Sequence, residues 1–403
     1  MFRGRDFASA TTRAASPAPA GSSMHGAAPP ASRPACARLS DASRHPISAA
    51  TSAFLDALRI LSAAIVFASH CAQFWNARLS ALLEPLAHAS VVVFFVLSGY
   101  VVTYSTSSKL GNGAGHYAVA RLSRLYSIVA PALALTALLA VVGAALAPAF
   151  HAQLARGFGA LRYLLTALFL QNVWTFSASP PTNGPLWSLS YEFWYYVLFG
   201  CAVFVRPVRA RAGALALVML AAGPNILLLM PCWIVGAAIC IGRPALDAAL
   251  TRPRVALASG LVLVAASVLA MPPLPLPLGS SALRFSAAFL TDWVTALGVA
   301  TVIAAFSASG MRSPAPWASA WLRRAGDLTF PLYLFHFPMI VFVTAAVPFD
   351  SRDAAQALPM AGAILASALV LGGLADRSRP AWHDGFERLR ERAAQARARR
   401  TIR

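Results

Sequence analysis

Two ionisable residues, Arg59 and His70, stand 11 positions apart within a run of mostly apolar residues. In an α-helix this separation is about three turns and about 16.5 Å of rise, so both side chains lie on one helix face at different depths. An imidazole can remove a proton from a hydroxyl near neutral pH, because its unperturbed pKa is about 6.5. Ionisable groups persist in such apolar runs mainly where they have a function. We therefore interpret Arg59 and His70 as functional residues.

Asp56 precedes Arg59 by three positions, a spacing that allows an ion pair on one helix. The pattern favours a structural role in which this pair anchors the inner end of the helix. A role in substrate binding is the alternative.

A carboxylate, Glu192, lies about two turns into another apolar run, which begins near Pro185. Counting about 1.5 Å per residue from the ends of the two runs places Glu192 and His70 at compatible depths, in the outer half of a bilayer. Two interpretations stay open. Glu192 either orients the imidazole or binds substrate hydroxyls, or it is a structural carboxyl that accepts hydrogen bonds from Ser or Tyr hydroxyls.

Polar side chains also interrupt the apolar segments 94–100 and 329–336. Ser98 and Gly99 in the first segment favour a packing seam, since small residues let membrane helices approach closely. Tyr333 and His336 belong to the second segment, with His336 near mid-membrane. A single His on an apolar helix is more often a hydrogen-bonded core residue than a catalyst. Ser98, Tyr333 and His336 are therefore assigned to substrate binding or to structure.

Two arginines, Arg121 and Arg124, lie three positions apart at the inner mouth of a predicted helix. They share a helix face, and their forked donors suit a ligand with paired phosphates. The alternative is ordinary charge that fixes membrane topology, and the spacing does not separate the two interpretations.

The elements that must position these residues are membrane helices. The 403 residues are 58% hydrophobic and 12% charged, with a mean hydropathy of +0.63. A membrane crossing needs roughly 20 apolar residues, and such runs follow one another along the chain. They predict an all-α, polytopic bundle of ten transmembrane helices over residues 54–75, 86–104, 125–147, 186–205, 212–229, 231–241, 255–271, 285–308, 328–347 and 358–374.

Three parts are expected: a disordered basic tail over 1–50, a transmembrane domain over 51–376, and an Arg-rich cytoplasmic tail over 377–403. The first tail is rich in Ala, Ser, Pro and Arg and has too few apolar residues to form a core. Met24 is an alternative start. The apolar stretch 163–174 is too short to cross and is expected to form a re-entrant or interfacial helix.

Basic residues between the runs predict the orientation. Cytoplasmic loops of membrane proteins carry more Lys and Arg. With the N-terminus inside, twelve basic loop residues fall on the cytoplasmic side and five outside, and the C-terminus is also cytoplasmic. The net charge of +19 therefore reflects topology in a plasma (inner) membrane rather than nucleic-acid binding. The five cysteines form no CxxC pair or spaced Cys/His set, so neither a disulfide framework nor a metal site is expected.

Taken in order, these motifs resemble the acyltransferase-3 family of integral membrane acyltransferases. The resemblance covers nearly the whole apolar region. It rests on Asp56 and Arg59 with His70, the Phe-Phe and Leu-Ser-Gly groups of segment 94–99, Arg121 with Arg124, segment 186–189 with Glu192, and Tyr333 with His336.

The resemblance implies ten helices that move an acyl group, usually acetyl, from acyl-coenzyme A to a hydroxyl of a glycan, exopolysaccharide or related metabolite. It also implies that Arg59 and His70 are needed for activity and that Arg121 and Arg124 bind the coenzyme. The acceptor is less defined, because many relatives have Gly and a polar residue where this chain has Ser90 and Val92, and a second Glu at Phe193.

These residues suggest a mechanism in which His70 removes the proton of the acceptor hydroxyl, with Arg59 as a candidate for contact with the thioester carbonyl or the coenzyme. The acceptor is either a free glycan or a lipid-linked sugar. The alternative function is a secondary transporter of a sugar or small polar solute, because intramembrane His, Arg and Glu also form proton and substrate pathways.

Overall fold

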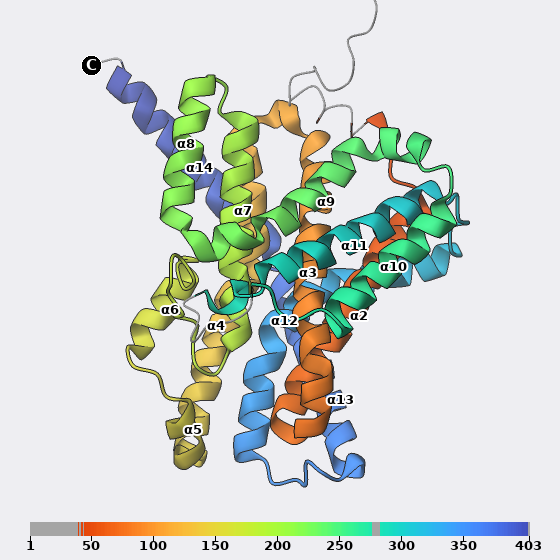
Figure 1. Cartoon of the computed structure of the whole chain (residues 1–403). Helices are drawn as coiled ribbons and strands as arrows, with labels where there is room; N and C mark the ends of the chain where they lie inside the picture. The colour runs from red at the N-terminus through yellow and green to blue at the C-terminus, as the bar shows by residue number, and fades with distance from the viewer. Residues whose placement is uncertain (1–38, 40–41, 43, 276–282, 402–403) are drawn as a thin grey trace, which may run out of the picture. The chain divides into compact units, whose positions relative to one another are not determined.

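The computed structural model describes Leu39, Ala42 and residues 44–275 and 283–401, which contain helices and loops but no strand. Figure 1 shows long helices packed side by side. The all-α fold predicted from the sequence is confirmed. The principal helices are α2 (Ala49–Trp75), α3 (Ala77–Ser107), α4 (Gly113–Leu146), α7 (Trp187–Phe204), α8 (Val208–Ala222), α9 (Pro224–Ala249), α10 (Pro253–Leu269), α11 (Phe289–Ala308), α12 (Pro316–Ala346), α13 (Ala354–Asp376) and α14 (Arg379–Thr401).

Seven of the described helices are long and apolar enough to cross a membrane, namely α2, α3, α4, α9, α11, α12 and α13. The shorter helices α7, α8 and α10, of 18, 15 and 17 residues, correspond to three further predicted spans. The predicted runs therefore correspond to helices within α2–α13, but α3, α4 and α12 begin 9 to 12 residues before their runs, and the boundary between the fifth and sixth runs is wrong.

The wrong boundary separates the fifth and sixth predicted spans. The break was expected at Leu229 and Pro231, but the chain turns at Gly223 and α9 continues through Pro231. Gly223 has φ of 79°, a left-handed value that favours glycine, and a Cβ added there would lie 2.6 Å from the backbone of Trp174. Pro224 then occupies the first turn of α9, where its missing N–H costs nothing. An internal Pro such as Pro231 is tolerated in membrane helices, because neighbouring groups satisfy the freed carbonyl.

The connection between α4 and α7 contains two short helices, α5 (Pro148–Leu154) and α6 (Gly159–Ala167). The helix predicted over 163–174 therefore starts earlier and ends earlier than expected. The backbone turns at Phe169 and Trp174, which both have positive φ. Beyond α6 the chain packs into the bundle, where the Gln171 Nε2 donates to the Leu186 carbonyl at 2.8 Å.

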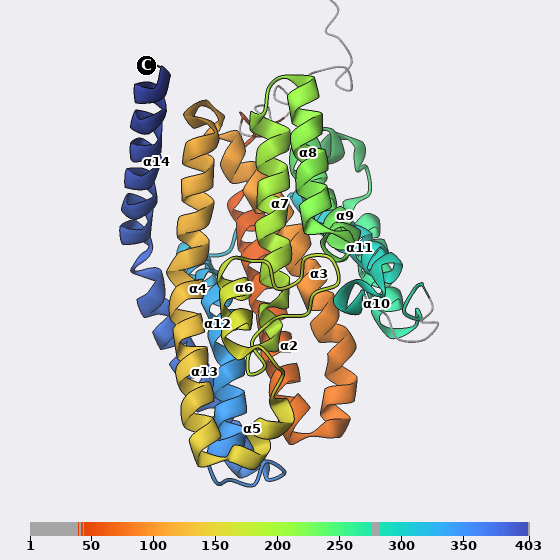
Figure 2. The ribbon, with the colours of Figure 1, turned by 90° about the vertical axis from the view of Figure 1, so that its left-hand side faces the viewer.

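The structure describes little of the predicted N-terminal tail and most of the predicted C-terminal tail. Of the predicted disordered tail over residues 1–50, residues 1–38, 40, 41 and 43 lie outside the described part of the chain. Helix α2 begins at Ala49, where the Ser48 hydroxyl accepts a hydrogen bond from the Thr51 N–H at 3.0 Å. The Arg-rich segment after Arg377 is the helix α14, which packs along α4 (Figure 2). Trp382 stacks on Tyr126, with ring centroids 5.7 Å apart.

Helices α2 and α3 form a hairpin at Asn76, whose side chain caps α3 by accepting a hydrogen bond from the Leu79 N–H. Helix α12 packs against both α2 and α4. Helices α3 and α9 meet at Gly99 and Gly236, where an added Cβ would lie 2.0 Å and 1.9 Å from backbone carbonyl oxygens of the other helix. This agrees with the packing seam predicted for segment 94–100. Together these contacts fix the walls of the site described next.

Candidate active site: two chambers that meet at Tyr333

A first cavity of about 110 Å³ lies between α2, α3, α4, α7 and α12, and is called here the first chamber. Most residues singled out from the sequence line it. Those residues are Arg59, Ser98, Arg121, Arg124, Glu192 and Tyr333. The chamber therefore collects three guanidinium groups and one carboxylate.

The three arginines of the first chamber are held in different ways. Arg59 pairs with Asp56, with Nη1 3.1 Å from Oδ1. Arg121 donates from Nη2 to the Ser105 hydroxyl at 2.7 Å and lies over the ring of Tyr196, 5.7 Å from its centroid. Arg124 lies over the ring of Phe330 at 5.8 Å. The Arg121 and Arg124 guanidiniums have no carboxylate partner among the described residues, which leaves their charge available to an anionic ligand.

Glu192 occupies the same chamber and accepts a hydrogen bond from the Tyr196 hydroxyl, one turn further along α7. The Ser98 hydroxyl lies 3.4 Å from the Glu192 carboxylate and accepts a bond from the Trp233 indole N–H at 3.2 Å. Partners of this type are those expected for a structural carboxyl. Glu192 nevertheless lines the cavity, so it can also contact a bound molecule.

A second cavity of about 430 Å³, the second chamber, lies between α2, α3, α12 and the short helices η3 (Gly184–Leu186) and η4 (Arg284–Ser286). His70 lines this chamber, whereas Arg59, on the same helix, lines the first. The separation along one helix face agrees with the spacing of the two residues. Glu192 does not line the second chamber, so the depth count that placed it level with His70 did not bring the two together.

His70 and His336 form a directed hydrogen-bond chain. His336 Nδ1 lies 2.8 Å from the Leu332 carbonyl oxygen, which can only accept, so this nitrogen carries the proton. In a neutral His336 ring, Nε2 is then an acceptor, and it lies 2.8 Å from Nδ1 of His70. His70 therefore donates from Nδ1, which leaves the lone pair of its Nε2 free. This is the tautomer that a general base needs, and the orienting partner of His70 is His336 rather than Glu192.

Tyr333 lines both chambers, together with Val91. Its hydroxyl donates to the Pro185 carbonyl at 2.8 Å and accepts from the Ser188 hydroxyl at 2.9 Å. These bonds tie α12 to the start of α7 at the level where the two cavities meet. Tyr333 is thus part of the wall between the arginine-lined chamber and the chamber that contains His70.

Sequence reasoning missed a pair beside the second chamber that joins the partly exposed His88 to the buried Asp292. His88 Nε2 lies 2.8 Å from Oδ1 of Asp292, and His88 lines the cavity. Both residues fall inside predicted membrane spans. The rule that selected His70, that ionisable groups in apolar runs mark function, would also have selected them.

Comparison with known protein families identifies the family of this chain. A family model described as an acyltransferase domain, Acyl_transf_3, matches residues 52–375. The chain belongs to the acyltransferase-3 family. No curated protein and no solved structure matches it. The matched residues run from α2 to α13 and include both chambers, so this acyltransferase is a multi-pass membrane protein.

One group of side chains in the described part of the acyltransferase has ligand atoms close enough to hold a metal ion. It consists of His116 on α4 with His383 and Glu387 on α14, whose ligand atoms lie within 4.8 Å of one another. Glu387 is already paired with Arg390, and none of the three lines either chamber. The polar groups that line the two chambers are imidazole, guanidinium, carboxyl, amide and hydroxyl groups.

Proposed function

We propose that the protein transfers an acyl group, usually acetyl, from acyl-coenzyme A to a hydroxyl of a glycan, exopolysaccharide or related metabolite. The observation that carries this proposal is the hydrogen-bond chain from the Leu332 carbonyl through His336 to His70. It gives His70 a basic Nε2 in a cavity large enough for a small acceptor.

In the proposed reaction, His70 Nε2 removes the proton of the acceptor hydroxyl as its oxygen attacks the thioester carbonyl. The new acyl–oxygen bond forms and the acyl–sulfur bond breaks. The proton then passes from His70 to the departing thiolate, so the products are the ester and free coenzyme A. General base catalysis of this kind contributes about 10²- to 10⁴-fold in rate.

The first chamber suits the donor. Coenzyme A carries several phosphates, and Arg121 and Arg124 offer two guanidiniums without a carboxylate partner on one face of α4. Arg59 lies deeper along α2, where the thioester end of the donor would have to reach toward His70. Glu192 would contact the uncharged arm of the donor or keep the arginines in place.

The sidedness of the reaction follows from the charge distribution. The basic loops predict that the arginine-lined chamber opens to the cytoplasm, where acyl-coenzyme A is made, and that the enzyme lies in the plasma (inner) membrane. The second chamber would then receive a free glycan or a lipid-linked sugar from the other side. The protein would bind no nucleic acid and need no metal ion.

The test uses membranes that contain the full-length protein and acetyl-coenzyme A labelled in the acetyl group. Wild-type membranes should transfer label to a glycan or lipid-linked fraction, and His70→Ala membranes should lose at least 100-fold of this rate while still binding acetyl-coenzyme A. Near-normal transfer by His70→Ala would rule out His70 as the base. Failure of the purified protein to bind acetyl-coenzyme A would favour the alternative, a transporter of a sugar or small polar solute.

A further inference from the structure

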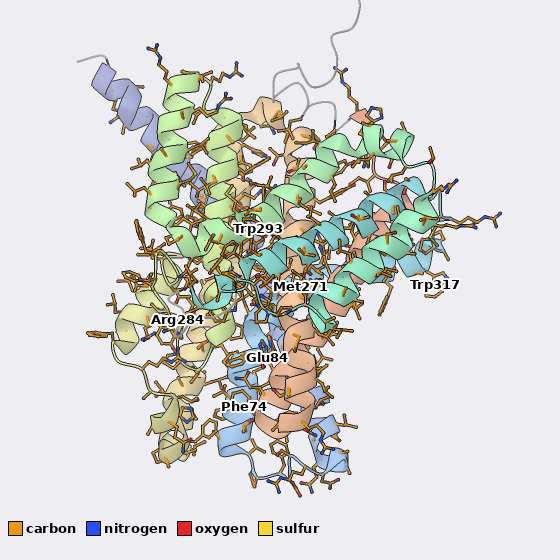
Figure 3. The ribbon with its side chains drawn as sticks, in the orientation of Figure 1. Phe74, Glu84, Met271, Arg284, Trp293 and Trp317 are labelled. Atoms are coloured by element: carbon orange, nitrogen blue, oxygen red, sulfur yellow. The ribbon has the colours of Figure 1, made fainter. Side chains whose placement is uncertain are left out.

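The second chamber has polar groups that the proposed chemistry does not use. Ser80, Glu84 and His88 recur every four residues along α3, so they lie on one helix face. Gln73 adds an amide from α2. Figure 3 marks Glu84 on α3. These groups can each make hydrogen bonds to hydroxyls, and they lie in the same cavity as the base.

His88 is held in place by a deeply buried carboxylate. Asp292 is 3% exposed, and His88 is its only hydrogen-bond partner through a side-chain oxygen, since Oδ2 is buried without one among the described residues. The His88 side chain keeps 35% of its surface exposed, and it faces a cavity. If the pair only stabilised the packing of the helices, no part of the His88 ring would need to face a cavity. The Asp292 carboxylate therefore fixes the ring while the rest of the imidazole stays available to a ligand.

Aromatic rings form another part of the wall. Trp187 and Phe285 stack with ring centroids 4.1 Å apart and ring planes 5° from parallel. Phe337 meets the His70 ring edge to face at 5.0 Å. All of these side chains line the second chamber. An aromatic surface beside a few placed hydrogen-bonding groups is the usual composition of a small-ligand pocket, and it matches a sugar ring, which has apolar C–H faces and a rim of hydroxyls.

The charge of the second chamber is opposite to that of the first. Its described lining includes the carboxylate of Glu84 and no Arg or Lys, whereas Asp292 is paired with His88. Glu84 has no ion-pair partner among the described residues. A carboxylate on the ligand would meet the like charge of Glu84 here, and the two carboxylates would repel each other.

We propose that the second chamber binds one neutral, polyhydroxylated sugar ring of the acceptor, with Glu84 and the Asp292-held His88 hydrogen-bonding its hydroxyls. This rests on the proposed function and narrows its substrate class, because acidic sugars such as uronic acids are excluded. The volume of about 430 Å³ accommodates a small ligand rather than a stretch of polymer. His88 and Glu84 would set which hydroxyl reaches His70.

The first test measures binding without turnover. Purified full-length protein is titrated with methyl glycosides of glucose, galactose, mannose and N-acetylglucosamine, and with the corresponding glucuronic and galacturonic acids. At least one neutral glycoside should bind about tenfold or more tightly than its uronic acid counterpart. Equal or tighter binding of the acids across the panel would overturn the proposal, whether or not the protein transfers acyl groups.

The second test exchanges the charge. Glu84→Gln removes the exposed carboxylate and should increase the relative binding of the uronic acids at least fivefold, and Glu84→Arg should increase it further. Such a gain cannot come from damage to the fold. The matched control is Glu391→Gln on the exposed face of α14, which should change the binding of neither the neutral glycosides nor the uronic acids. No gain with Glu84→Arg would overturn the assignment.

The third test separates His88 from a structural role. His88→Gln combined with Asp292→Asn replaces the ion pair by a neutral pair and avoids an isolated buried charge. In transfer assays the double variant should raise the KM for the neutral acceptor about tenfold, with the KM for acetyl-coenzyme A unchanged. A parallel rise in both KM values, or an unchanged acceptor KM, would overturn the role of His88. If the wild type transfers no acyl group, the proposed function fails, and the binding tests above still decide the sugar site.

Discussion

His70 and His336 share a hydrogen bond of 2.8 Å across 266 positions of sequence. His336 is 1% exposed and donates from its other nitrogen to the Leu332 carbonyl of its own helix. The backbone of α12 therefore determines which nitrogen of His70 is basic. Neither the ring orientation nor the tautomer of His70 depends on a carboxylate.

The first prediction concerns His336 as a positioning residue. His336→Ala removes the acceptor for the His70 Nδ1–H, so the wrong tautomer becomes populated, and kcat should fall about 100-fold. The KM for acetyl-coenzyme A should not change, because the donor is proposed to bind in the first chamber, which His336 does not line. Steady-state kinetics of transfer in membranes would measure both constants.

A matched variant separates this effect from loss of packing. His336→Gln keeps an acceptor oxygen at similar reach and should recover at least tenfold of the activity lost in His336→Ala. Thermal unfolding of both variants would show whether they are equally folded. If Gln and Ala were equally inactive at equal stability, the tautomer argument would be wrong.

The second prediction concerns Arg121 and Arg124. Replacing either arginine by Gln should raise the KM for acetyl-coenzyme A about tenfold, since a charge-assisted hydrogen bond to phosphate contributes about 1.5–3 kcal/mol. Acetyl-pantetheine lacks the nucleotide phosphates, so its turnover should be almost unaffected by the same substitutions. Kinetics with the two donors would measure the difference.

Arg209, exposed on α8, provides the control for these substitutions. Arg209→Gln should leave the KM and the turnover of both donors unchanged. If Arg121→Gln or Arg124→Gln slowed acetyl-pantetheine as much as acetyl-coenzyme A, the arginines would serve the structure of the chamber rather than phosphate binding.

Residues that act within one helix were predictable from the sequence. The period of 3.6 residues places Arg59 and His70 on one face of α2, and the i, i+3 spacing pairs Arg59 with Asp56 as expected. The same arithmetic places Arg121 and Arg124 on one face of α4, and both line the first chamber.

Contacts between distant helices were not predictable in this way. Periodicity gives the face of a helix but not its neighbour, so it could not pair His70 with His336 or His88 with Asp292. The Gly223-Pro224 pair was recognisable as a helix-breaking dipeptide, but the close approach of Gly223 to Trp174 is visible only in the tertiary fold. Depth counting placed Glu192 level with His70, whereas the chambers separate them, because depth alone does not say which cavity a side chain faces.

The third prediction concerns the seam between α3 and α9. A methyl group at Gly99 would lie 2.0 Å from the Trp233 carbonyl oxygen, so Gly99→Ala must push the helices apart. The expected loss of stability is about 1–3 kcal/mol or more. Separation would also draw Ser98 away from Trp233, which reaches its hydroxyl at 3.2 Å. Unfolding in detergent would measure the loss.

Gly362 on α13 is the matched control, because nothing lies within 4 Å of the position its Cβ would take. Gly362→Ala should leave stability unchanged or raise it by about 0.5–1 kcal/mol, as expected for Ala in place of Gly within a helix. Equal stability of the Gly99→Ala and Gly362→Ala variants would contradict the close packing of this seam.

The last prediction concerns Tyr333, whose side chain lies where the two chambers meet. Under the proposed function, an acyl group must pass this point while water is kept from the thioester. Tyr333→Ala should open the wall and increase hydrolysis of acetyl-coenzyme A relative to transfer by at least fivefold.

Tyr333→Phe is the control, because it keeps the ring but loses the hydrogen bonds to Pro185 and Ser188. It should lower stability by about 1–3 kcal/mol with little added hydrolysis, because buried partners are left unsatisfied. Free coenzyme A and labelled ester, measured in the same reaction, separate the two outcomes. If Tyr333→Ala kept the wild-type ratio of hydrolysis to transfer, this side chain would not be the barrier between donor and acceptor.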